Sequence, residues 1–312
     1  MKIAIIGSGS IGLYYGAKLV AAGEDVRFLM RSGFDLASRD GIRVASADGD
    51  VHISSPSVAR DTEEIGPVDL VVIALKVTDN ESLKDLVPPL LGPATMLLTL
   101  QNGLGNEDFL ADHFGPERIL GGLCFVCLTR DSPVSVEHFG HGTLSLGEFQ
   151  TVGKSPRLAD VVARFERASI DARMVDHLIT ERWRKLVWNI PFNGLSVAAG
   201  GVAVDQILAD ATLHAECRAL MAEVIATANA LGHRIPEDFG QVQIERTYPM
   251  GAYQPSTMVD FLAGKPLEIE AIWGEPMRRA LSVGMEVPHL SALYAKLVVA
   301  AKISSNARVS RS

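Results

Sequence analysis

The sequence predicts an α/β N-terminal half followed by an all-helical C-terminal half. Short apolar runs alternate with amphipathic stretches in the first half, whereas from residue 179 onward the apolar spacing is helical nearly throughout. The length of 312 residues also exceeds the ~250–300 at which a single hydrophobic core stops growing. We therefore expect one domain at 1–176, a second at 177–303, and a flexible polar tail at 304–312.

The apolar runs of the first half are the expected strands. They show little alternation, which is typical of strands covered on both faces in a parallel sheet flanked by helices. Helices are expected at residues 11–23 and 157–169, between and after these runs. The expected strands are residues 2–7, 25–31, 51–54, 68–76, 95–100, 118–129, 142–148 and 172–175.

Composition and charge exclude several function classes. The net charge is −8 and no dense Lys/Arg stripe occurs, so we expect no nucleic acid and no membrane surface as partner. No apolar stretch approaches the ~20 residues that span a bilayer. An odd, small number of cysteines (Cys124, Cys127 and Cys217) argues against a disulfide framework. We expect a soluble, cytoplasmic protein.

Two patterns suggest a metal site, and we expect none. Cys124 and Cys127 form C-x-x-C within an apolar strand, where this spacing sends the two sulfurs to opposite faces, and no second pair exists. His138 and His141 lie in a glycine-rich stretch without an obvious third ligand. We expect both histidines to be solvated in a loop.

The first strand and helix enclose a glycine pattern typical of dinucleotide binding. G-x-G-x-x-G occurs at Gly7, Gly9 and Gly12, directly after a strand and at the start of a helix. Gly7 permits the tight turn, Gly9 lets the backbone approach the pyrophosphate, and Gly12 allows close helix–strand packing. The alternative is a glycine-rich turn without a ligand. We favour a Rossmann-type domain, with further cofactor-binding candidates at Ser8, Ser10 and Ile11.

Three polar residues follow the expected strands. Arg31 ends the second strand, where NAD enzymes usually have a carboxylate, and a guanidinium there favours the 2′-phosphate of NADP(H). Lys76 and Asn102 follow two later strands, and open α/β sheets bind ligands at the carboxyl ends of their strands. The alternatives are a solvated surface arginine and loop residues without a role.

The stretch 181–196 places polar residues along one helix face. Lys185, Asn189, Asn193 and Ser196 recur at i, i+4, i+8 and i+11 within an otherwise apolar helix, so they need polar partners, which a substrate pocket would supply. The alternative is a surface helix in which Lys185 pairs with the glutamate four residues earlier. We expect the proline at 191 to bend this helix or to break it near Asn193.

Over essentially its whole length the chain resembles the ketopantoate reductase (2-dehydropantoate 2-reductase) family. The matching pieces are GSGSIG near the N-terminus, LK at 75–76, QNGLGNED at 101–108, ERWRKLVWN at 181–189, and PSTMVDFLAGKPLEIEAIWG at 255–274. The resemblance implies NADPH-dependent reduction of 2-dehydropantoate to pantoate, a step of pantothenate biosynthesis.

The same resemblance implies residue roles. Lys185 matches the general acid, and Glu268 matches a second catalytic residue beside it. An ammonium suits this role because hydride addition builds negative charge on the carbonyl oxygen. Ser256 matches a group that binds the substrate carboxylate, with helix capping as the alternative; for Glu268 the alternative is an exposed helix glutamate. The remaining matches are the substrate-contacting amides Asn102, Asn189 and Asn193, and Lys76 near cofactor and substrate.

Other functions stay open at this stage. Residues 198–202 read AAGGV where the family often has a further asparagine, so the substrate can be another branched 2-oxo acid. A related 3-hydroxy acid dehydrogenase also pairs two domains with a K-x-x-x-N helix, but Glu268 and the PSTM segment speak against it. A non-catalytic NADP(H)-sensing protein would not need Lys185 and Glu268. A homodimer is the assembly that we consider.

Overall fold

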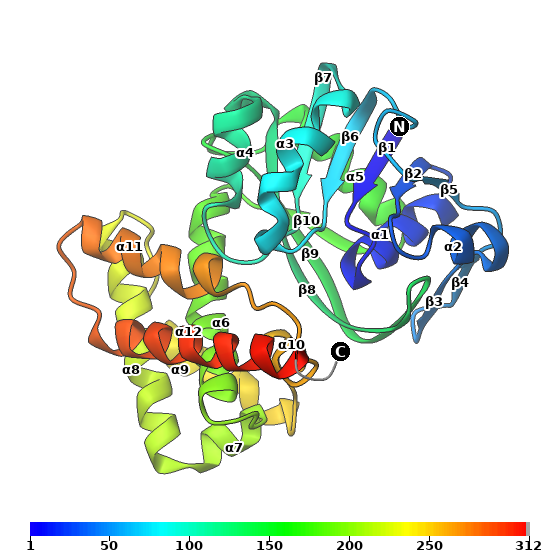
Figure 1. Cartoon of the computed structure of the whole chain (residues 1–312). Helices are drawn as coiled ribbons and strands as arrows, with labels where there is room; N and C mark the ends of the chain where they lie inside the picture. The colour runs from blue at the N-terminus through cyan, green and yellow to red at the C-terminus, as the bar shows by residue number, and fades with distance from the viewer. Residues whose placement is uncertain (310–312) are drawn as a thin grey trace. The chain divides into compact units, whose positions relative to one another are not determined.

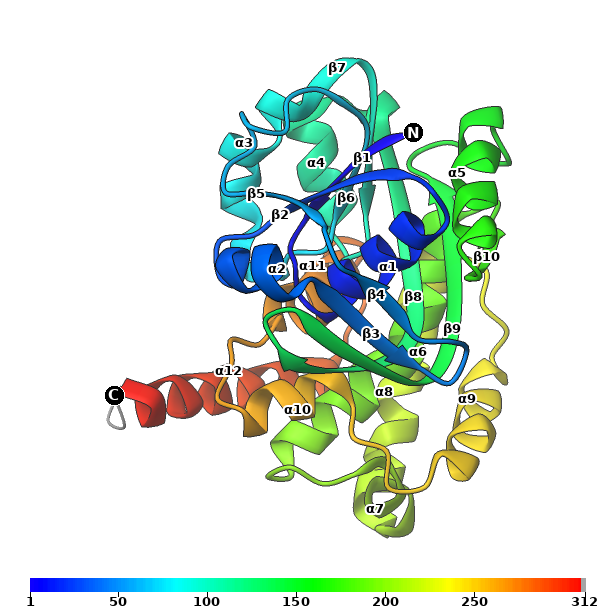
Figure 2. The same ribbon diagram turned by 90° about the vertical axis from the view of Figure 1, so that its right-hand side faces the viewer.

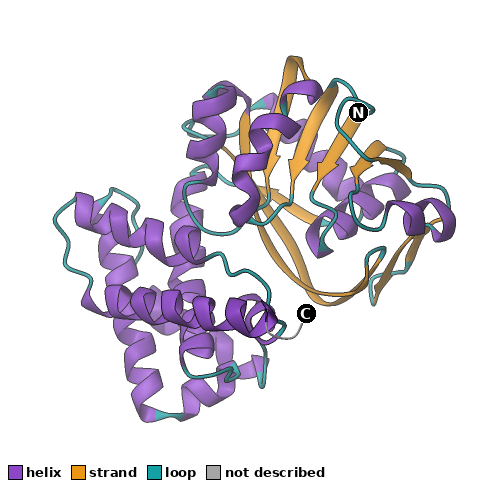
Figure 3. Ribbon diagram, viewed as in Figure 1, coloured by secondary structure: helices purple, strands orange, loops and turns teal. Residues whose placement is uncertain are grey.

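The computed structural model describes residues 1–309, with side chains through Lys302. It divides into two compact units. The sheet unit comprises residues 1–101 and 106–178, and the helical unit comprises residues 102–105 and the chain from residue 179 onward. Figure 3 shows all strands in the first unit and mostly helices in the second. The α/β half followed by a helical half is thus confirmed.

The sheet unit is built on a ten-stranded mixed sheet in the order β4-β3-β9-β8-β7-β6-β1-β2-β5, with β10 paired to β9. Pairing is parallel from β8 through β5, so these strands end at one edge. The chain passes from β1 to one side and later to the other, which is the switch point where such sheets bind ligands. The strands are β1 (Lys2–Ile6), β2 (Asp25–Leu29), β3 (Ile42–Ser46), β4 (Val51–Ile53), β5 (Ser57–Ala59), β6 (Val68–Ile73), β7 (Leu91–Thr99), β8 (Ile119–Ser132), β9 (Ser135–Glu148) and β10 (Asp171–Met174).

Helices cover both faces of the parallel part of this sheet, which is why strands such as β1 and β6 are apolar with little alternation. Figures 1 and 2 show α3 and α4 on one face of the parallel strands and α1 and α5 on the other. Tyr15 of α1 and Phe165 of α5 pack edge to face within the core on the second side. The helices are α1 (Ser10–Ala21), α2 (Phe34–Asp40), α3 (Leu83–Leu86), α4 (Asn106–Phe114) and α5 (Pro156–Arg167), with short 3₁₀ turns η1 (Val77–Ser82), η2 (Pro88–Leu90) and η3 (Pro116–Arg118).

The expectation of a loop was wrong for both histidines, and the expectation of a solvated side chain was wrong for His138 but correct for the exposed His141. His138 and His141 lie in strand β9, which begins at Ser135 and pairs with both β8 and β3. His138 is buried; its Nδ1 lies 2.9 Å from the Ser46 hydroxyl and its Nε2 2.7 Å from the His141 carbonyl oxygen. Strand β3 was missed in the sequence, and its pairing covers the segment that we assigned to a solvated loop. Among the described residues no cluster of His, Cys, Asp or Glu fits a metal ion.

The helical unit packs around a second apolar core that includes Trp183, Trp273 and Leu290. Helix α12 continues to Val309, through residues assigned to a tail from the sequence, and residues 310–312 lie outside the described part. None of the helices described is long and apolar enough to cross a membrane. The elements are α6 (Leu178–Ala198), α7 (Val204–Ala209), α8 (Ala211–Ala230), α9 (Phe239–Thr247), η4 (Tyr248–Met250), α10 (Ser256–Leu262), the π-helix η5 (Glu270–Gly274), α11 (Glu275–Ser282) and α12 (Pro288–Val309).

Helix α6 does not break at Pro191, which lies inside a single helix that ends at Ala198. A buried tryptophan packs against the helix beside the proline. The indole Nε1 of Trp273 donates to the Ile190 carbonyl oxygen (3.0 Å), and a Cβ on Gly194 would lie 2.8 Å from that Nε1. The glycine therefore lets a fully buried tryptophan close against the helix just beyond the proline.

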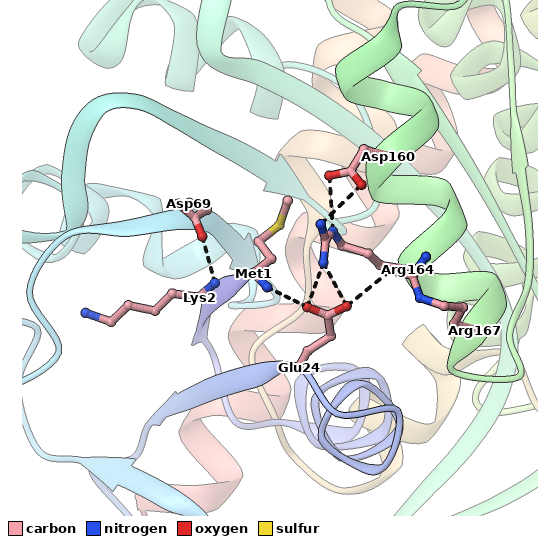
Figure 4. Close-up of polar contacts among 7 residues, drawn as sticks. All are labelled: Met1, Lys2, Glu24, Asp69, Asp160, Arg164 and Arg167. Carbon is pink, nitrogen blue, oxygen red and sulfur yellow. Dashed lines mark hydrogen bonds and ion pairs between the residues drawn. The ribbon is translucent and has the colours of Figure 1, made fainter.

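Glu24, between α1 and β2, is the centre of a buried ion-pair cluster in the sheet unit (Figure 4). Its carboxylate accepts hydrogen bonds from the N-terminal ammonium of Met1 and from Arg164 of α5, both at 2.9 Å. Burial alone would raise the pKa of Glu24, but these two cations outweigh burial and lower its pKa below the ordinary 4.5. The cluster therefore joins the chain start, α1 and α5.

We predict that Glu24→Gln lowers the free energy of unfolding by about 1–3 kcal/mol at pH 7, because the N-terminal ammonium and the Arg164 guanidinium lose a charged acceptor. Since the pKa of Glu24 is lowered in the folded state, its contribution is fully present above pH 4.5 and is lost as the pH falls through the folded pKa. In urea unfolding across this pH range, the free energies of unfolding of Glu24→Gln and the unaltered protein should become equal in acid. Glu63→Gln, at an exposed carboxylate, is the control. If the difference in free energy of unfolding between Glu24→Gln and the unaltered protein did not change with pH, the stabilising role of the Glu24 carboxylate would be contradicted.

Candidate active site

The turn between β1 and α1 is shaped by two close backbone contacts. Gly7 has φ +102°, and a Cβ there would lie 2.4 Å from the backbone nitrogen of Leu75, in the turn after β6. A Cβ on Gly12 would lie 2.1 Å from the Gly7 carbonyl oxygen. At Gly9 a Cβ would meet nothing within 4 Å, so this side of the turn is open. Two glycines thus form the turn, and the third leaves space for a ligand.

The first turn of α1 leaves its amide groups available. Gly9 is the N-cap and provides no side-chain cap, and no acidic residue lies in the first turn. Ser10 and Ile11 begin the helix, so their N–H groups belong to the four that have no partner within a helix. Ser8 does not compete for them, because its hydroxyl donates to the Leu29 carbonyl oxygen at the end of β2 (2.7 Å). The turn therefore fits the pyrophosphate of a dinucleotide.

Two cations lie at the carboxyl ends of neighbouring strands. Arg31 comes two residues after β2 and is exposed, and no described residue bonds to its side chain. Lys76 is the N-cap of η1, after β6, and is half-buried. The parallel register of β1 with both β2 and β6 brings these strand ends to the edge that carries the glycine turn.

An amide network at the same edge was missed in the sequence. Gln101 donates from Nε2 to Asn80 Oδ1 (2.7 Å), and Asn80 donates from Nδ2 to Asn106 Oδ1 (3.2 Å). These residues come from η1, from the end of β7 and from the start of α4. Polar loop residues gave no separate signal, although Gln101 and Asn106 lie inside the quoted QNGLGNED motif. The network fixes both ends of the short segment 102–105.

In the helical unit, Lys185 of α6 meets a residue far away in the sequence. Its Nζ donates to Asn102 Oδ1 at 2.9 Å, and both side chains are half-buried. The surface-pair alternative was wrong, because Glu181 binds Arg184 (2.6 Å) instead of Lys185. The lysine therefore points toward the segment 102–105, which belongs to the helical unit although the chain on either side belongs to the sheet unit.

The segment 102–105 is anchored to the π-helix η5. The backbone N–H of Leu104 donates to the Ala271 carbonyl oxygen at 2.9 Å. Gly103 has φ +85°, and a Cβ there would lie 2.4 Å from the same oxygen. π-helices occur frequently at functional sites. Because Asn102 precedes this anchor, its side chain is held in place for Lys185.

Glu268 lies immediately before this helical segment. Ile269 is the N-cap of η5, and the N–H of Ile272 donates to the Glu268 carbonyl oxygen at 3.3 Å. The side chain of Glu268 is half-buried, which differs from the exposed helix glutamate considered as its alternative. The chain thus brings Glu268 to the start of the same helix that anchors the Asn102 segment.

The other polar residues of α6 have different surroundings. Asn193 is buried, and its Oδ1 accepts a hydrogen bond from the Thr257 N–H (3.1 Å), so it supports the first turn of α10. Ser256 begins α10 and is exposed, and it is not the cap: the N-cap is Pro255. Asn189 and Ser196 are buried on the same helix, and the Ser196 hydroxyl has no partner within the described structure.

Fold and site together define a class of protein. The sheet unit presents a dinucleotide-type turn with cationic strand ends, and the helical unit presents a lysine held by an asparagine. These are the features of a nicotinamide-dependent oxidoreductase.

Comparison with known proteins identifies the family. The family described as "Ketopantoate reductase PanE/ApbA" matches residues 3–151, and its C-terminal counterpart matches residues 177–300. A 2-dehydropantoate 2-reductase of Nostoc sp. is 38% identical over 300 residues, which are 95% of this chain and 94% of the relative. The chain belongs to the ketopantoate reductase family, which confirms the resemblance seen in the motifs.

Solved structures agree with this assignment. A 2-dehydropantoate 2-reductase from Geobacter metallireducens superposes with a TM-score of 0.93 at 42% identity, covering 96% of this chain and all of that one (100%). A second, from Methylococcus capsulatus, gives a TM-score of 0.90 at 35% identity, covering 98% of each chain. The Rossmann-type N-terminal domain and the helical C-terminal domain are therefore both confirmed.

We predict that Gly103→Ala disturbs the anchored segment more than backbone strain alone would. Gly232→Ala is the matched control, because Gly232 has φ +86° and no atom within 4 Å of a built Cβ. The clash with the Ala271 carbonyl oxygen should lower the free energy of unfolding by about 1–3 kcal/mol more than the control does. Chemical unfolding of both variants measures this difference. Equal losses of unfolding free energy would contradict the prediction, because they would show that the segment can shift at no cost.

Proposed function

We propose that this protein reduces 2-dehydropantoate to pantoate with NADPH, and so acts in pantothenate biosynthesis. The observation that carries the proposal is the hydrogen bond from Lys185 to Asn102, in a chain of the ketopantoate reductase family. It holds the ammonium group of this half-buried lysine in one orientation, which a proton donor needs.

Cofactor binding falls to the sheet unit in this proposal. NADPH, when bound, supplies the hydride. The free amides of Ser10 and Ile11 would hold the pyrophosphate. Gly7 and Gly12 allow the tight turn, and Gly9 leaves space for the ligand. The unpaired Arg31 would bind the 2′-phosphate through its guanidinium. We assign the remaining cofactor contacts to Ser8, Lys76 and Asn102.

Proton transfer falls to Lys185. As the carbonyl carbon of the substrate is reduced, negative charge grows on its oxygen, and an ammonium group at that oxygen stabilises the charge and then gives up its proton. Asn102 holds Nζ in one direction by accepting one of its three N–H groups. Glu268 would favour the charged form of the lysine and contact the new hydroxyl group.

Substrate binding is assigned to three polar residues of the helical unit. Asn193 uses its Oδ1 for the start of α10, and we assign its amide nitrogen to the substrate. Asn189, buried one turn earlier on α6, is the second amide. Ser256 is exposed at the start of α10 and would donate to the substrate carboxylate.

A second candidate substrate is another branched 2-oxo acid. The observation that favours it is the sequence AAGGV at 198–202, where the family often has an asparagine. The 3-hydroxy acid dehydrogenase and the NADP(H)-sensing protein have less support, because Lys185, Glu268 and the PSTM segment occur in a member of the ketopantoate reductase family.

We predict that the purified protein oxidises NADPH when 2-dehydropantoate is added, and that Lys185→Ala lowers kcat about 10²–10⁴-fold by removing the proton donor. Absorbance at 340 nm measures both, across a panel of 2-oxo acids with NADPH and NADH. Lys296→Ala, at an exposed position of α12, is the control and should leave kcat unchanged. No turnover of any 2-oxo acid, or a preference for NADH, would overturn the proposal.

We also propose a cytoplasmic location. All three cysteines are free, which suits a reducing compartment.

We propose a homodimer as the assembly. Val259 and Leu262 are exposed three residues apart on α10 and offer an apolar contact for a second copy. Sedimentation at micromolar concentration should give twice the mass of one chain, and Leu262→Glu should shift it to one chain. A single-chain mass for the unaltered protein would refute the dimer.

A further inference from the structure

Arg60 leaves the sheet at the same edge as Arg31. Strand β5 pairs in parallel with β2, in a register that sets Ala59 beside Leu29, and the Met30 N–H donates to the Ala59 carbonyl oxygen at 2.9 Å. Arg60 directly follows Ala59, and Arg31 comes two residues after Leu29. The two arginines therefore leave adjacent strand ends, and β2 lies next to β1, whose end carries the glycine turn.

The guanidinium of Arg60 is held in a fixed orientation. Its Cζ lies 4.1 Å from the centroid of the Phe34 ring, and its Nη2 donates to Asp35 Oδ1 at 2.7 Å. Stacking on an aromatic ring orients the planar fork and reduces the entropy lost when it binds an anion. Residues 34 and 35 begin α2, which closely follows Arg31 in the chain.

The ion pair with Asp35 is easily exchanged. The Arg60 side chain is 54% exposed and that of Asp35 is 87% exposed, so water screens their attraction. A phosphate carries more charge than a carboxylate and offers more acceptor oxygens to the same fork. A phosphate at this edge would therefore displace Asp35, while Phe34 keeps the guanidinium in position.

We propose that Arg60 is a second cation for the 2′-phosphate of NADP(H), and that Asp35 occupies its guanidinium until the phosphate displaces it. This inference rests on the cofactor of the proposed function, and it adds a residue that selects NADP(H) over NAD(H). Asp35 is then an internal competitor: it keeps the arginine paired in the free protein and discourages ligands that lack the 2′-phosphate.

Calorimetric titration with NADP⁺ and NAD⁺, which differ only in the 2′-phosphate, tests the inference without turnover. Arg60→Gln should weaken NADP⁺ binding by about tenfold and leave NAD⁺ binding within twofold. Asp35→Asn should tighten NADP⁺ binding by about threefold, because the competitor is gone. Arg39→Gln, at the exposed far end of α2 where Arg39 pairs with Asp40, is the control and should change neither.

The outcomes separate this inference from its alternatives. If Arg60 merely held α2 in place, both Arg60→Gln and Asp35→Asn would weaken NADP⁺ and NAD⁺ alike, and that result would overturn it. An unchanged preference for NADP⁺ in Arg60→Gln would also overturn it and leave the proposed reaction intact. If the nucleotide results hold but no 2-oxo acid is reduced, the reaction fails and the role of Arg60 stands.

Discussion

The reaction proposed for this chain depends on where the ammonium group of Lys185 is held. A half-buried lysine must find an acceptor or turn outward to water. Here the acceptor is Asn102 Oδ1, at 2.9 Å. Asn102 can serve because Leu104 is bonded to Ala271 and because Gly103 tolerates both a positive φ and the close carbonyl group. The backbone of the segment therefore determines the direction of the lysine.

The sheet unit carries the candidate cofactor site, and it is built differently from the surroundings of Lys185. Its candidate cofactor site consists mainly of backbone: uncapped amides at the start of α1 and glycines that leave room. Side chains contribute charge at the edges, as Arg31 does. Backbone amides suit a pyrophosphate that is common to many nucleotides, whereas an arginine at a strand end selects among them. In the proposed function, backbone amides thus bind the nucleotide and an arginine at the same sheet edge selects it.

Much of this could be predicted from the sequence, because the strongest signals are local. The glycines at 7, 9 and 12 lie between a strand and a helix, and their spacing alone describes the turn. Periodicity likewise placed Lys185, Asn189 and Asn193 on one helix. The family motifs then supplied Glu268 and Ser256, whose roles remain predictions.

What could not be predicted is non-local. The partner of Lys185 lies 83 residues away, and Asn193 supports a helix 64 residues further on. His138 is buried by a strand that the apolar pattern did not reveal, and the π-helix beside Glu268 has no pattern that we recognised. In each case tertiary packing decides the surroundings of the residue.

A double-mutant cycle tests the central claim most directly. The kcat/KM of Lys185→Ala, Asn102→Ala and the double variant would be compared with the unaltered protein, using NADPH and 2-dehydropantoate. If Asn102 acts by orienting the lysine, its removal should cost little once Lys185 is gone, so the double variant should match Lys185→Ala. If the fold loss of kcat/KM in the double variant equalled the product of the two single losses, the residues would act independently, and this would contradict the account.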